Sequence, residues 1–444
     1  MQDKFSKIGF ILAVAGSAVG LGNAWKFPYL VGQNGGSAFV LLYLFLTFFI
    51  GLTIFFGEVA IGKLSESDPV NAFKKLATTN KNGWKFAGFT MLGAIILVSF
   101  YTVVIGWIFK YAFMVLTNLP ADIETSAAIF TDFVSKDVSS QILFFTITNI
   151  ICFYIVSKGI KSGIERVNVW LMPSLLVLVI AMLAYSVTMD GFMQSAKFLL
   201  VPDFTKITFD SVLTALGLAF FTLSLGVGVI IVYSANLPNN TNLVSSSIII
   251  VIINVIMGIL IGLVIFTFVF EFGAEPSQGV GLVFISLPTL FAKLGTFGHI
   301  FAFALFTALI FAGITSAISM LEPFTYYLIR EFGFTRKKAL ISIAAFVYIA
   351  GILCIFSNIE GVKENLVFFG KSLFDCLDYL VSNIIMPIGG ITVSVFVGFV
   401  IKKEALRELY GPYMSKFMFD LWYFMIRYIA PIAIAVISVN AILS

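Results

Sequence analysis

The stretch GSAVGLGNAWKFP, residues 16–28, interrupts the first of a series of apolar runs, which begins near Ile8. Its glycines and proline weaken an α-helix, and Asn23 and Lys26 place polar groups inside the run. Such a break is costly in a membrane, because lipid offers no hydrogen-bond partner to the freed peptide groups. The break therefore predicts that something other than lipid binds those groups.

The composition of the chain is that of a membrane protein. Apolar residues make up 60% of the 444 positions, charged residues only 11%, and phenylalanine occurs 50 times. A soluble protein of this length needs far more polar surface. The net charge of +4 comes from loops, not from a basic domain, so a nucleic-acid-binding protein is excluded.

Eleven runs are long and apolar enough to cross the membrane, since about 20 apolar residues span a core of about 30 Å. They predict an all-α polytopic membrane protein. Most of the 27 basic residues lie in loops on the side of the N-terminus, which predicts the N-terminus inside the cell and the C-terminus outside. The runs lie near residues 8–29, 37–62, 88–116, 140–157, 168–188, 208–235, 244–270, 299–329, 338–356, 372–401 and 418–442.

A second interruption lies five spans after the first, at TLSLGVG, residues 222–228. Because five is an odd number, the span with the second interruption crosses the membrane in the direction opposite to the first span. Paired interruptions in two halves of opposite topology indicate a secondary transporter with its site at the bilayer midplane. We expect one transporter domain over 1–444, with inverted repeats at 8–188 and 208–401 and an additional helix at 418–442.

The first break has two interpretations. Gly16 and Gly20 can form a packing face of small residues, the commonest use of glycine in membrane helices. Alternatively, freed carbonyls bind sodium or an ammonium, and N–H groups at the start of a half-helix receive a carboxylate. Asn23, Lys26 and the second break favour binding, because polar groups at membrane depth usually face a cavity.

A third polar cluster lies in the eighth run, FAGITSAISM, residues 311–320. Thr315 and Ser316 offer hydroxyl oxygens beside a carbonyl near Ala312, and sodium prefers oxygen ligands. Without a partner segment, hydrogen bonding between helices is the simpler explanation of these hydroxyls.

The remaining polar residues do not indicate a catalytic or metal centre. Cys152, Cys354 and Cys376 have the spacing of neither a disulfide framework nor a zinc site. The one histidine, His299, opens the eighth run and is expected at the membrane interface. We therefore predict that the chain is not an enzyme.

Three segments together resemble the neurotransmitter:sodium symporter family, whose bacterial members include amino-acid transporters of the leucine-transporter fold. They are AVGLGNAWKFPYLVGQNGGSAFVLLY (18–43), FFTLSLGVG (220–228) and FAGITSAISMLEP (311–323). The resemblance implies that spans 1 and 6 unwind in mid-membrane. It also implies sodium-coupled symport of an amino acid into the cell by alternating access, across a bacterial inner membrane.

The resemblance implies two sodium sites at the breaks. All protein ligands of the first site are neutral, so a substrate carboxylate would supply the missing negative charge. Sodium and substrate would then strengthen each other's binding. The implied ligands are Ala18, Asn23, Thr222 and Asn254 for site one, and Gly16, Val19, Ala312, Thr315 and Ser316 for site two.

The resemblance also outlines a substrate pocket. Gly20 stands where monoamine-carrying members have an aspartate, which leaves room for a substrate that brings its own carboxylate. That carboxylate would meet the N–H groups of Leu21 and Gly22 and the Tyr101 hydroxyl. We expect a large hydrophobic or aromatic amino acid. The ammonium is expected near Ala18, Phe221, Thr222 and Ser224, and the walls from Leu97, Phe221, Val227, Ser316, Ser319 and Met320.

The expected gates depart in part from the family pattern. Lysine stands where the outer ion pair usually has arginine, and it makes a less directional pair. At the inner gate, Lys4 and Phe5 stand for the usual arginine and tryptophan, Arg330 replaces an expected acid, and Glu331 is a candidate substitute. The outer gate is expected from Lys26, Asp378, Tyr101 and Phe221.

The family's chloride-binding positions also depart from the usual pattern. Glutamine is usual at the position of Leu218, and serine is usual at the position of Gly258. Chloride-independent members often carry an acid at the position of Gly258 or of Asn254. This chain has neither pattern, and we expect transport that does not require chloride. The matching positions are Tyr43, Leu218, Thr222, Asn254 and Gly258.

Two other functions stay open. An ion channel needs a continuous polar lining, whereas the polar residues here cluster at mid-depth. An amino-acid sensor of transporter descent would keep the same pocket without net transport. We expect a monomer or weak homodimer in the lipid bilayer, with no nucleic-acid partner.

Overall fold

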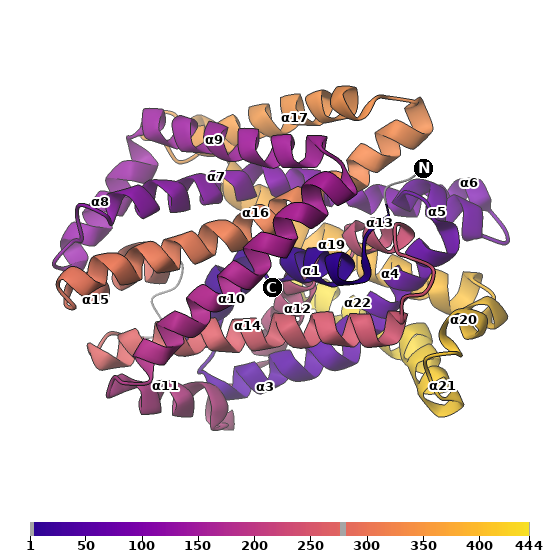
Figure 1. The fold of residues 1–444 in the computed structure, drawn as a ribbon, viewed down its shortest axis with the longest axis horizontal. Helices are drawn as coiled ribbons and strands as arrows, with labels where there is room; N and C mark the ends of the chain where they lie inside the picture. The colour runs from indigo at the N-terminus through magenta and orange to yellow at the C-terminus, as the bar shows by residue number, and fades with distance from the viewer. Residues whose placement is uncertain (1–3, 276–280, 444) are drawn as a thin grey trace.

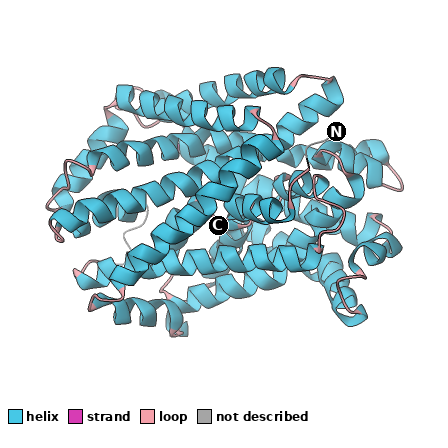
Figure 2. Ribbon diagram, viewed as in Figure 1, coloured by secondary structure: helices cyan, strands magenta, loops and turns pink. Residues whose placement is uncertain are grey.

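Long helices lying side by side make up the molecule (Figures 1 and 2). The computed structural model describes residues 4–275 and 281–443. Within that part of the chain, the only strands are two two-residue strands that pair antiparallel, Val367 with Ser372 and Phe368 with Lys371. The all-α prediction is confirmed.

The first half of the chain consists of α-helices with short π-helical or 3-10 helical segments between some of them. The α-helices are α1 (Lys7–Ala18), α2 (Phe27–Gln33), α3 (Ser37–Leu46), α4 (Leu52–Ser65), α5 (Pro69–Leu76), α6 (Lys81–Trp84), α7 (Leu92–Met114), α8 (Ile123–Ser135), α9 (Val138–Ser157), α10 (Arg166–Ser186) and α11 (Gly191–Leu200). Wider, π-helical turns cover η1 (Gly22–Lys26), η2 (Thr47–Gly51) and η4 (Ile160–Glu165), and tighter 3-10 turns cover η3 (Lys85–Met91) and η5 (Phe204–Lys206).

The second half continues in the same way. Its α-helices are α12 (Phe209–Thr222), α13 (Val229–Ala235), α14 (Leu243–Glu271), α15 (Leu287–Ala292), α16 (Thr296–Phe332), α17 (Arg336–Phe356), α18 (Leu373–Tyr379), α19 (Met386–Val395), α20 (Lys403–Tyr410), α21 (Lys416–Phe424) and α22 (Ala430–Leu443). The wider turns are η6 (Leu282–Ser286), η8 (Leu380–Ile385), η9 (Phe396–Val400) and η10 (Met425–Ile429), the tighter one is η7 (Lys363–Leu366), and the strands are β1 (Val367–Phe368) and β2 (Lys371–Ser372).

Nine helices among the described residues are long and apolar enough to span a membrane, or ten if the bent pair at the N-terminus is one span. The remaining expected span, at 208–235, consists of two short helices, α12 and α13, that do not meet the length criterion separately. The count of eleven therefore stays a prediction that includes this divided span, and so does the division into inverted repeats.

The first break is narrower than the sequence predicts. Helical structure continues to Ala18, is interrupted over 19–21, and resumes at Gly22 with a bend of 44°. The residues at 16–18 stay helical because the i−4 ladder persists up to Val19, whose N–H donates to the Ala15 carbonyl at 2.6 Å. The break thus occupies only residues 19–21 of the quoted stretch.

The second break occupies residues 223–228, close to the expected 222–228. The chain there takes positive φ values at Ser224 (54°), Gly226 (81°) and Gly228 (78°). A Cβ at Gly226 would lie 2.2 Å from the Met386 carbonyl oxygen, so only glycine fits this position. The fully buried Glu58 of α4 accepts a hydrogen bond from the Gly226 N–H at 2.6 Å and holds the broken segment.

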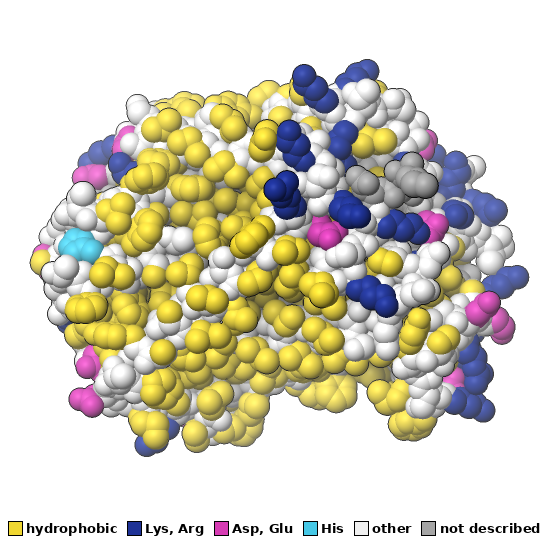
Figure 3. All heavy atoms as spheres, in the orientation of Figure 1, with side chains coloured by type: hydrophobic (Ala, Val, Ile, Leu, Met, Phe, Trp, Pro, Cys, Tyr) yellow, Lys and Arg dark blue, Asp and Glu magenta, His cyan; other side chains and the backbone are white. Residues whose placement is uncertain are grey.

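The outer surface of the helices is apolar, as a membrane protein requires. Trp170 is 73% exposed and Ile8 70% exposed, and hydrophobic side chains cover much of the face in Figure 3. Lysines and arginines gather toward the side where the N-terminus, α5, α6 and α20 lie (Figures 1 and 3). The opposite end carries α8, α11 and α15 (Figure 1), helices formed by segments that the sequence places between the apolar runs.

Candidate functional site

The two broken helices meet α16 at a cluster of serine hydroxyls. Ser319 donates a hydrogen bond to Ser17 Oγ at 2.7 Å, and Ser17 donates to Ser224 Oγ at 3.2 Å. The Ser17 carbonyl accepts hydrogen bonds from Ser224 at 3.1 Å and Ser316 at 3.0 Å. Sequence reasoning missed Ser17, although its place within the first motif signalled it.

The four residues expected at site one lie together. Asn23 donates from Nδ2 to the carbonyl oxygen of Asn254 at 2.8 Å and to Asn254 Oδ1 at 2.7 Å. The Oδ1 position of the Asn254 side chain also lies 3.1 Å from the Ala18 carbonyl oxygen and 3.2 Å from the Thr222 carbonyl oxygen.

The amide of Asn254 can satisfy this geometry in two ways. With nitrogen at that end it donates to both carbonyls; with oxygen there, three oxygens converge on one point, the arrangement that a cation needs. All of these groups are buried. The donor set therefore fits a small hard cation such as sodium.

Four of the five residues expected at site two, Gly16, Ala312, Thr315 and Ser316, lie together. Ser316 donates from Oγ to the Gly16 carbonyl at 3.2 Å, which joins α16 to α1. Thr315 donates to the Ala312 carbonyl at 3.0 Å, within α16. Val19 lies at the C-terminal end of α1 and is fully buried. The elements thus bring together carbonyl and hydroxyl oxygens from both helices.

Donors suited to a carboxylate converge at the first break. The Leu21 N–H donates to the Tyr101 hydroxyl at 2.9 Å, which joins the break to α7. A Cβ on Gly20 would lie 2.2 Å from Ser316 Oγ and 2.8 Å from the Tyr101 hydroxyl. A Cβ on Gly22 would lie 2.9 Å from the Phe221 ring. The missing side chains of Gly20 and Gly22 therefore bring Tyr101, Ser316 and Phe221 against the broken backbone.

The side chains expected to wall the pocket lie in and around the breaks, and all of them except Phe221 are buried. Val227 lies against α7, because a Cβ built on Gly93 of that helix would be only 3.2 Å from Val227 Cγ1. Leu97 belongs to α7, and Ser319 and Met320 belong to α16, which packs on α7. Phe221 is half-buried at the end of α12.

Four of the five positions matching the family's chloride site, Tyr43, Thr222, Asn254 and Gly258, lie beside site one. The Tyr43 hydroxyl is 3.1 Å from Thr222 Oγ1 and accepts from Asn254 Nδ2 at 3.3 Å. Gly258 lies near Asn23, since a Cβ built on Gly258 would be 3.8 Å from Asn23 Cγ, an ordinary van der Waals distance. Leu218 is buried and offers no hydrogen-bond donor to an anion.

Lys26 and Asp378, two of the residues expected at the outer gate, form an ion pair. Lys26 Nζ lies 3.5 Å from Asp378 Oδ1 and 4.4 Å from the centroid of the Phe221 ring. Ser382 donates to Asp378 at 3.0 Å. A largely aromatic cavity of about 280 Å³ adjoins this pair, and its lining includes Leu21, Tyr101 and Phe221.

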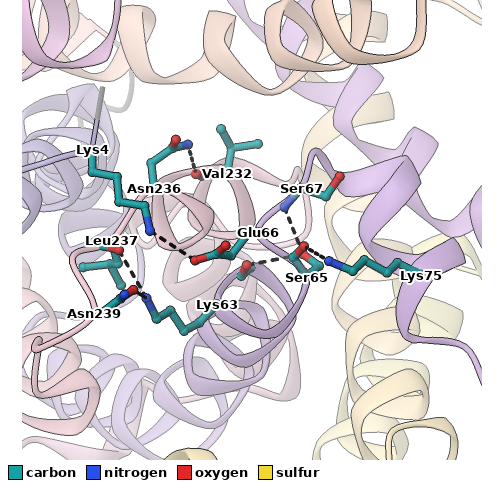
Figure 4. Close-up of polar contacts among 11 residues, drawn as sticks. Lys4, Lys63, Ser65, Glu66, Ser67, Lys75, Val232, Asn236, Leu237 and Asn239 are labelled. Atoms are coloured by element: carbon teal, nitrogen blue, oxygen red, sulfur yellow. Dashed lines mark hydrogen bonds and ion pairs between the residues drawn. The ribbon is translucent and has the colours of Figure 1, made fainter. Parts of the chain in front are cut away.

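The end of the molecule that carries the N-terminus is held by lysines that bind the ends of α4 and α13 (Figure 4). Lys4 donates to Glu66 at 3.1 Å, and this hydrogen bond holds the pKa of the Glu66 carboxyl below its usual value. Lys63 donates to the Leu237 carbonyl at 3.2 Å, and Lys75 donates to the Ser65 carbonyl at 2.9 Å.

The charges considered for the inner gate have other partners. Lys4 pairs with Glu66 instead of a residue of α16. Arg330 donates to Ser67 at 3.2 Å, and Glu331 accepts from Asn71 at 3.1 Å. The last two contacts join α16 to the segment after α4.

An ion pair with a fully buried carboxylate lies at the same end and was missed by the sequence reasoning. Arg336, at the start of α17, donates to Glu322 of α16 from both Nη1 and Nη2, with Nη1 3.0 Å from Glu322 Oε1. The Glu322 side chain is fully buried. The sequence signal was an acid inside an apolar run, beside Pro323, followed by a basic segment.

The other reactive side chains are one histidine and three cysteines. His299 is half-buried, with Nδ1 2.6 Å from the Val115 carbonyl oxygen. Cys152, Cys354 and Cys376 are free thiols. Over residues 4–275 and 281–443, no group of three or more His, Cys, Asp or Glu side chains is placed to hold a metal ion.

Comparison with known proteins places the chain among sodium-dependent transporters. It is 38% identical to the uncharacterized sodium-dependent transporter YhdH of Bacillus subtilis, over 98% of this chain and 97% of that one. It is 24% identical to the sodium- and chloride-dependent GABA transporter 2 of Rattus norvegicus, over 85% of this chain and 69% of the relative.

Among solved structures, that of MhsT in complex with L-phenylalanine superposes with a TM-score of 0.90 at 35% identity, over 99% of this chain and 100% of that one. The sequence profile of the Sodium:neurotransmitter symporter family matches residues 2–131 and 134–444. The chain therefore belongs to the sodium:neurotransmitter symporter family.

Proposed function

We propose that the protein carries a large hydrophobic or aromatic amino acid into the cell together with sodium. The observation that carries this proposal is the meeting of three groups at the first break: the Leu21 N–H, the Tyr101 hydroxyl and the side-chain-free Gly20. A carboxylate placed there would accept from two donors and meet no fixed negative charge. Complex formation between the related MhsT and L-phenylalanine supports this substrate class.

Sodium supplies the driving force in this proposal. Site one is formed by Ala18, Asn23, Thr222 and Asn254 together with the substrate carboxylate, which is its only negative ligand. Binding of either partner therefore favours the other. Two sodium ions entering an interior held about 100 mV negative release about 4.6 kcal/mol, enough to drive uphill accumulation.

Site two gathers oxygens that are neutral as well. It combines the carbonyls of Gly16, Val19 and Ala312 with the hydroxyls of Thr315 and Ser316. Because these groups belong to α1 and α16, a sodium ion there joins a broken helix to an unbroken one. We propose that sodium occupancy at this place controls whether α1 stays packed against α16.

Chloride is not required in this proposal. Leu218 and Gly258 remove the polar groups that chloride-dependent members use at these positions. Replacing chloride with gluconate should leave uptake unchanged, since only Tyr43, Thr222 and Asn254 remain as polar partners for an anion. A strict chloride requirement would overturn this part of the proposal.

The test is sodium-driven uptake by the purified protein in proteoliposomes. Each of the twenty amino acids is offered with sodium or with potassium outside, and counterflow is measured with an unlabelled amino acid inside. Saturable, sodium-dependent uptake and counterflow support symport. Sodium-dependent binding without counterflow identifies a sensor, and unitary currents identify a channel.

The proposed setting is a bacterial inner membrane, with the N-terminus inside and the protein acting as a monomer or weak homodimer. Alternating access would move the four spans at 8–29, 37–62, 208–235 and 244–270 against the others. Labelling of single cysteines from each side of oriented vesicles tests the orientation.

A further inference from the structure

Asn168 of α10 carries a buried polar atom that none of the assigned sites uses. Its side chain is fully buried, and its Oδ1 has no hydrogen-bond partner among the described residues. A buried amide oxygen without a partner loses its hydration and gains no hydrogen bond in return. Such an atom calls for a cation or a water molecule beside it.

The orientation of the Asn168 amide is fixed by its other end. Nδ2 donates to the Ile164 carbonyl at 2.8 Å, one turn earlier in the chain. A flipped amide would place oxygen against that carbonyl oxygen and lose this hydrogen bond. Oδ1 therefore faces away from the backbone of α10.

Oδ1 points at the first broken helix. A Cβ on Gly16 would lie only 2.0 Å from Asn168 Oδ1 and 3.1 Å from the Thr315 Cβ. The amide oxygen thus occupies the space that a side chain at residue 16 would need. The same space borders Gly16 and Thr315, two of the residues that contribute oxygens to site two.

We propose that Asn168 is a further sodium-binding residue of site two, its Oδ1 contacting the ion directly or through one water molecule. Amide oxygens are suitable ligands for hard cations. The contact would add a third helix, α10, to the two helices that sodium joins, and it would explain why residue 16 must lack a side chain. This inference rests on the proposed sodium symport.

The test is a sodium titration of labelled phenylalanine binding, or of whichever amino acid binds best, on purified protein. Asn168→Leu keeps the side-chain volume and removes the oxygen. We expect the half-saturating sodium concentration to rise roughly tenfold, the size of one lost contact to a charged group. Asn168→Asp, which keeps an oxygen, should bind sodium at least as well as wild type at neutral pH and more weakly as protons compete at low pH.

The matched control is Asn149 of α9, another buried asparagine whose Nδ2 donates to a carbonyl one turn earlier, Phe145 at 2.9 Å, and whose Oδ1 also has no partner among the described residues. Asn149→Leu should leave the sodium titration unchanged. Equal shifts in both leucine variants, or no shift in Asn168→Leu and no pH effect in Asn168→Asp, overturn the inference. Wild-type binding that ignores sodium would instead refute the proposed function.

Discussion

Gly20 owes its importance to the two side chains that face it. Its absent Cβ leaves the Ser316 hydroxyl and the Tyr101 hydroxyl beside the broken backbone. The resemblance to known transporters predicted an open position here from the missing aspartate alone. The structure adds a steric reason, because even a methyl group would have to displace a hydroxyl.

Gly20→Asp should lower amino-acid binding at least a hundredfold, because it adds both bulk and a carboxylate that repels the substrate's own. Gly20→Ala adds only bulk, and we expect it to weaken amino-acid binding less than Gly20→Asp does. Both are measured by equilibrium binding in saturating sodium. Gly217→Ala is the control, since a Cβ there meets nothing within 4 Å; unchanged binding in Gly20→Asp would count against this pocket.

Asn23→Ala and Thr222→Ala should abolish sodium-stimulated uptake. Asn23 contributes the amide that binds Asn254 at 2.8 Å and 2.7 Å, and Thr222 lies between Tyr43 and the second break. Uptake into proteoliposomes along a sodium gradient measures the effect. Near-normal, sodium-stimulated uptake in both variants would contradict the proposed sodium role.

At the scale of elements, the second broken helix depends on Glu58. Its carboxylate accepts from the Gly226 N–H, while its other oxygen has no hydrogen-bond partner within the described residues. Glu58→Gln keeps an acceptor for Gly226, whereas Glu58→Ala removes it. A buried donor left without a partner costs about 1 to 3 kcal/mol.

We therefore expect Glu58→Ala to unfold at lower temperature than Glu58→Gln and to lose transport. The measurement is thermal unfolding in detergent, combined with uptake. Ser186→Ala serves as a comparison, because it removes a buried hydroxyl that bonds only to its own helix, at 2.9 Å from the Met182 carbonyl. Equal stability of the Ala and Gln variants at Glu58 would show that the carboxylate does not hold the break.

The elements show where sequence reasoning succeeds and where it stops. Composition and glycine placement located both breaks, because unwinding needs local residues that weaken a helix. The same reasoning placed the first break too early by counting Gly16 as unwound, since local propensity cannot reveal that α10 and α16 support the helix through Ala18. Asn168 escaped notice for the same reason: its role depends on its distance from Gly16, which the sequence does not give.

At the scale of the whole molecule, the end that carries the N-terminus is held together by ion pairs and hydrogen bonds of α16. Arg336 and Glu322 form a buried pair there, whereas Arg330 and Glu331 bind the segment after α4. The sequence indicated that the usual inner pair was missing, but it did not indicate the pair of Arg336 with Glu322, because that pair joins two helices across a turn.

Arg336→Ala should destabilise the protein by about 3 to 5 kcal/mol, because it leaves the fully buried Glu322 without its partner. The double variant Glu322→Gln with Arg336→Gln should be less destabilised, since neither charge then remains. Thermal unfolding of both proteins in the same detergent checks the order. A double variant less stable than Arg336→Ala would contradict this assignment.

The central claim is that the broken backbone binds an amino acid and sodium as one unit. The most direct measurement is a reciprocal titration: phenylalanine binding at several sodium concentrations, and radioactive sodium binding at several phenylalanine concentrations. The account predicts that each ligand lowers the dissociation constant of the other by the same factor, as linkage requires. Amino-acid binding that is equally tight in sodium and in potassium would contradict it.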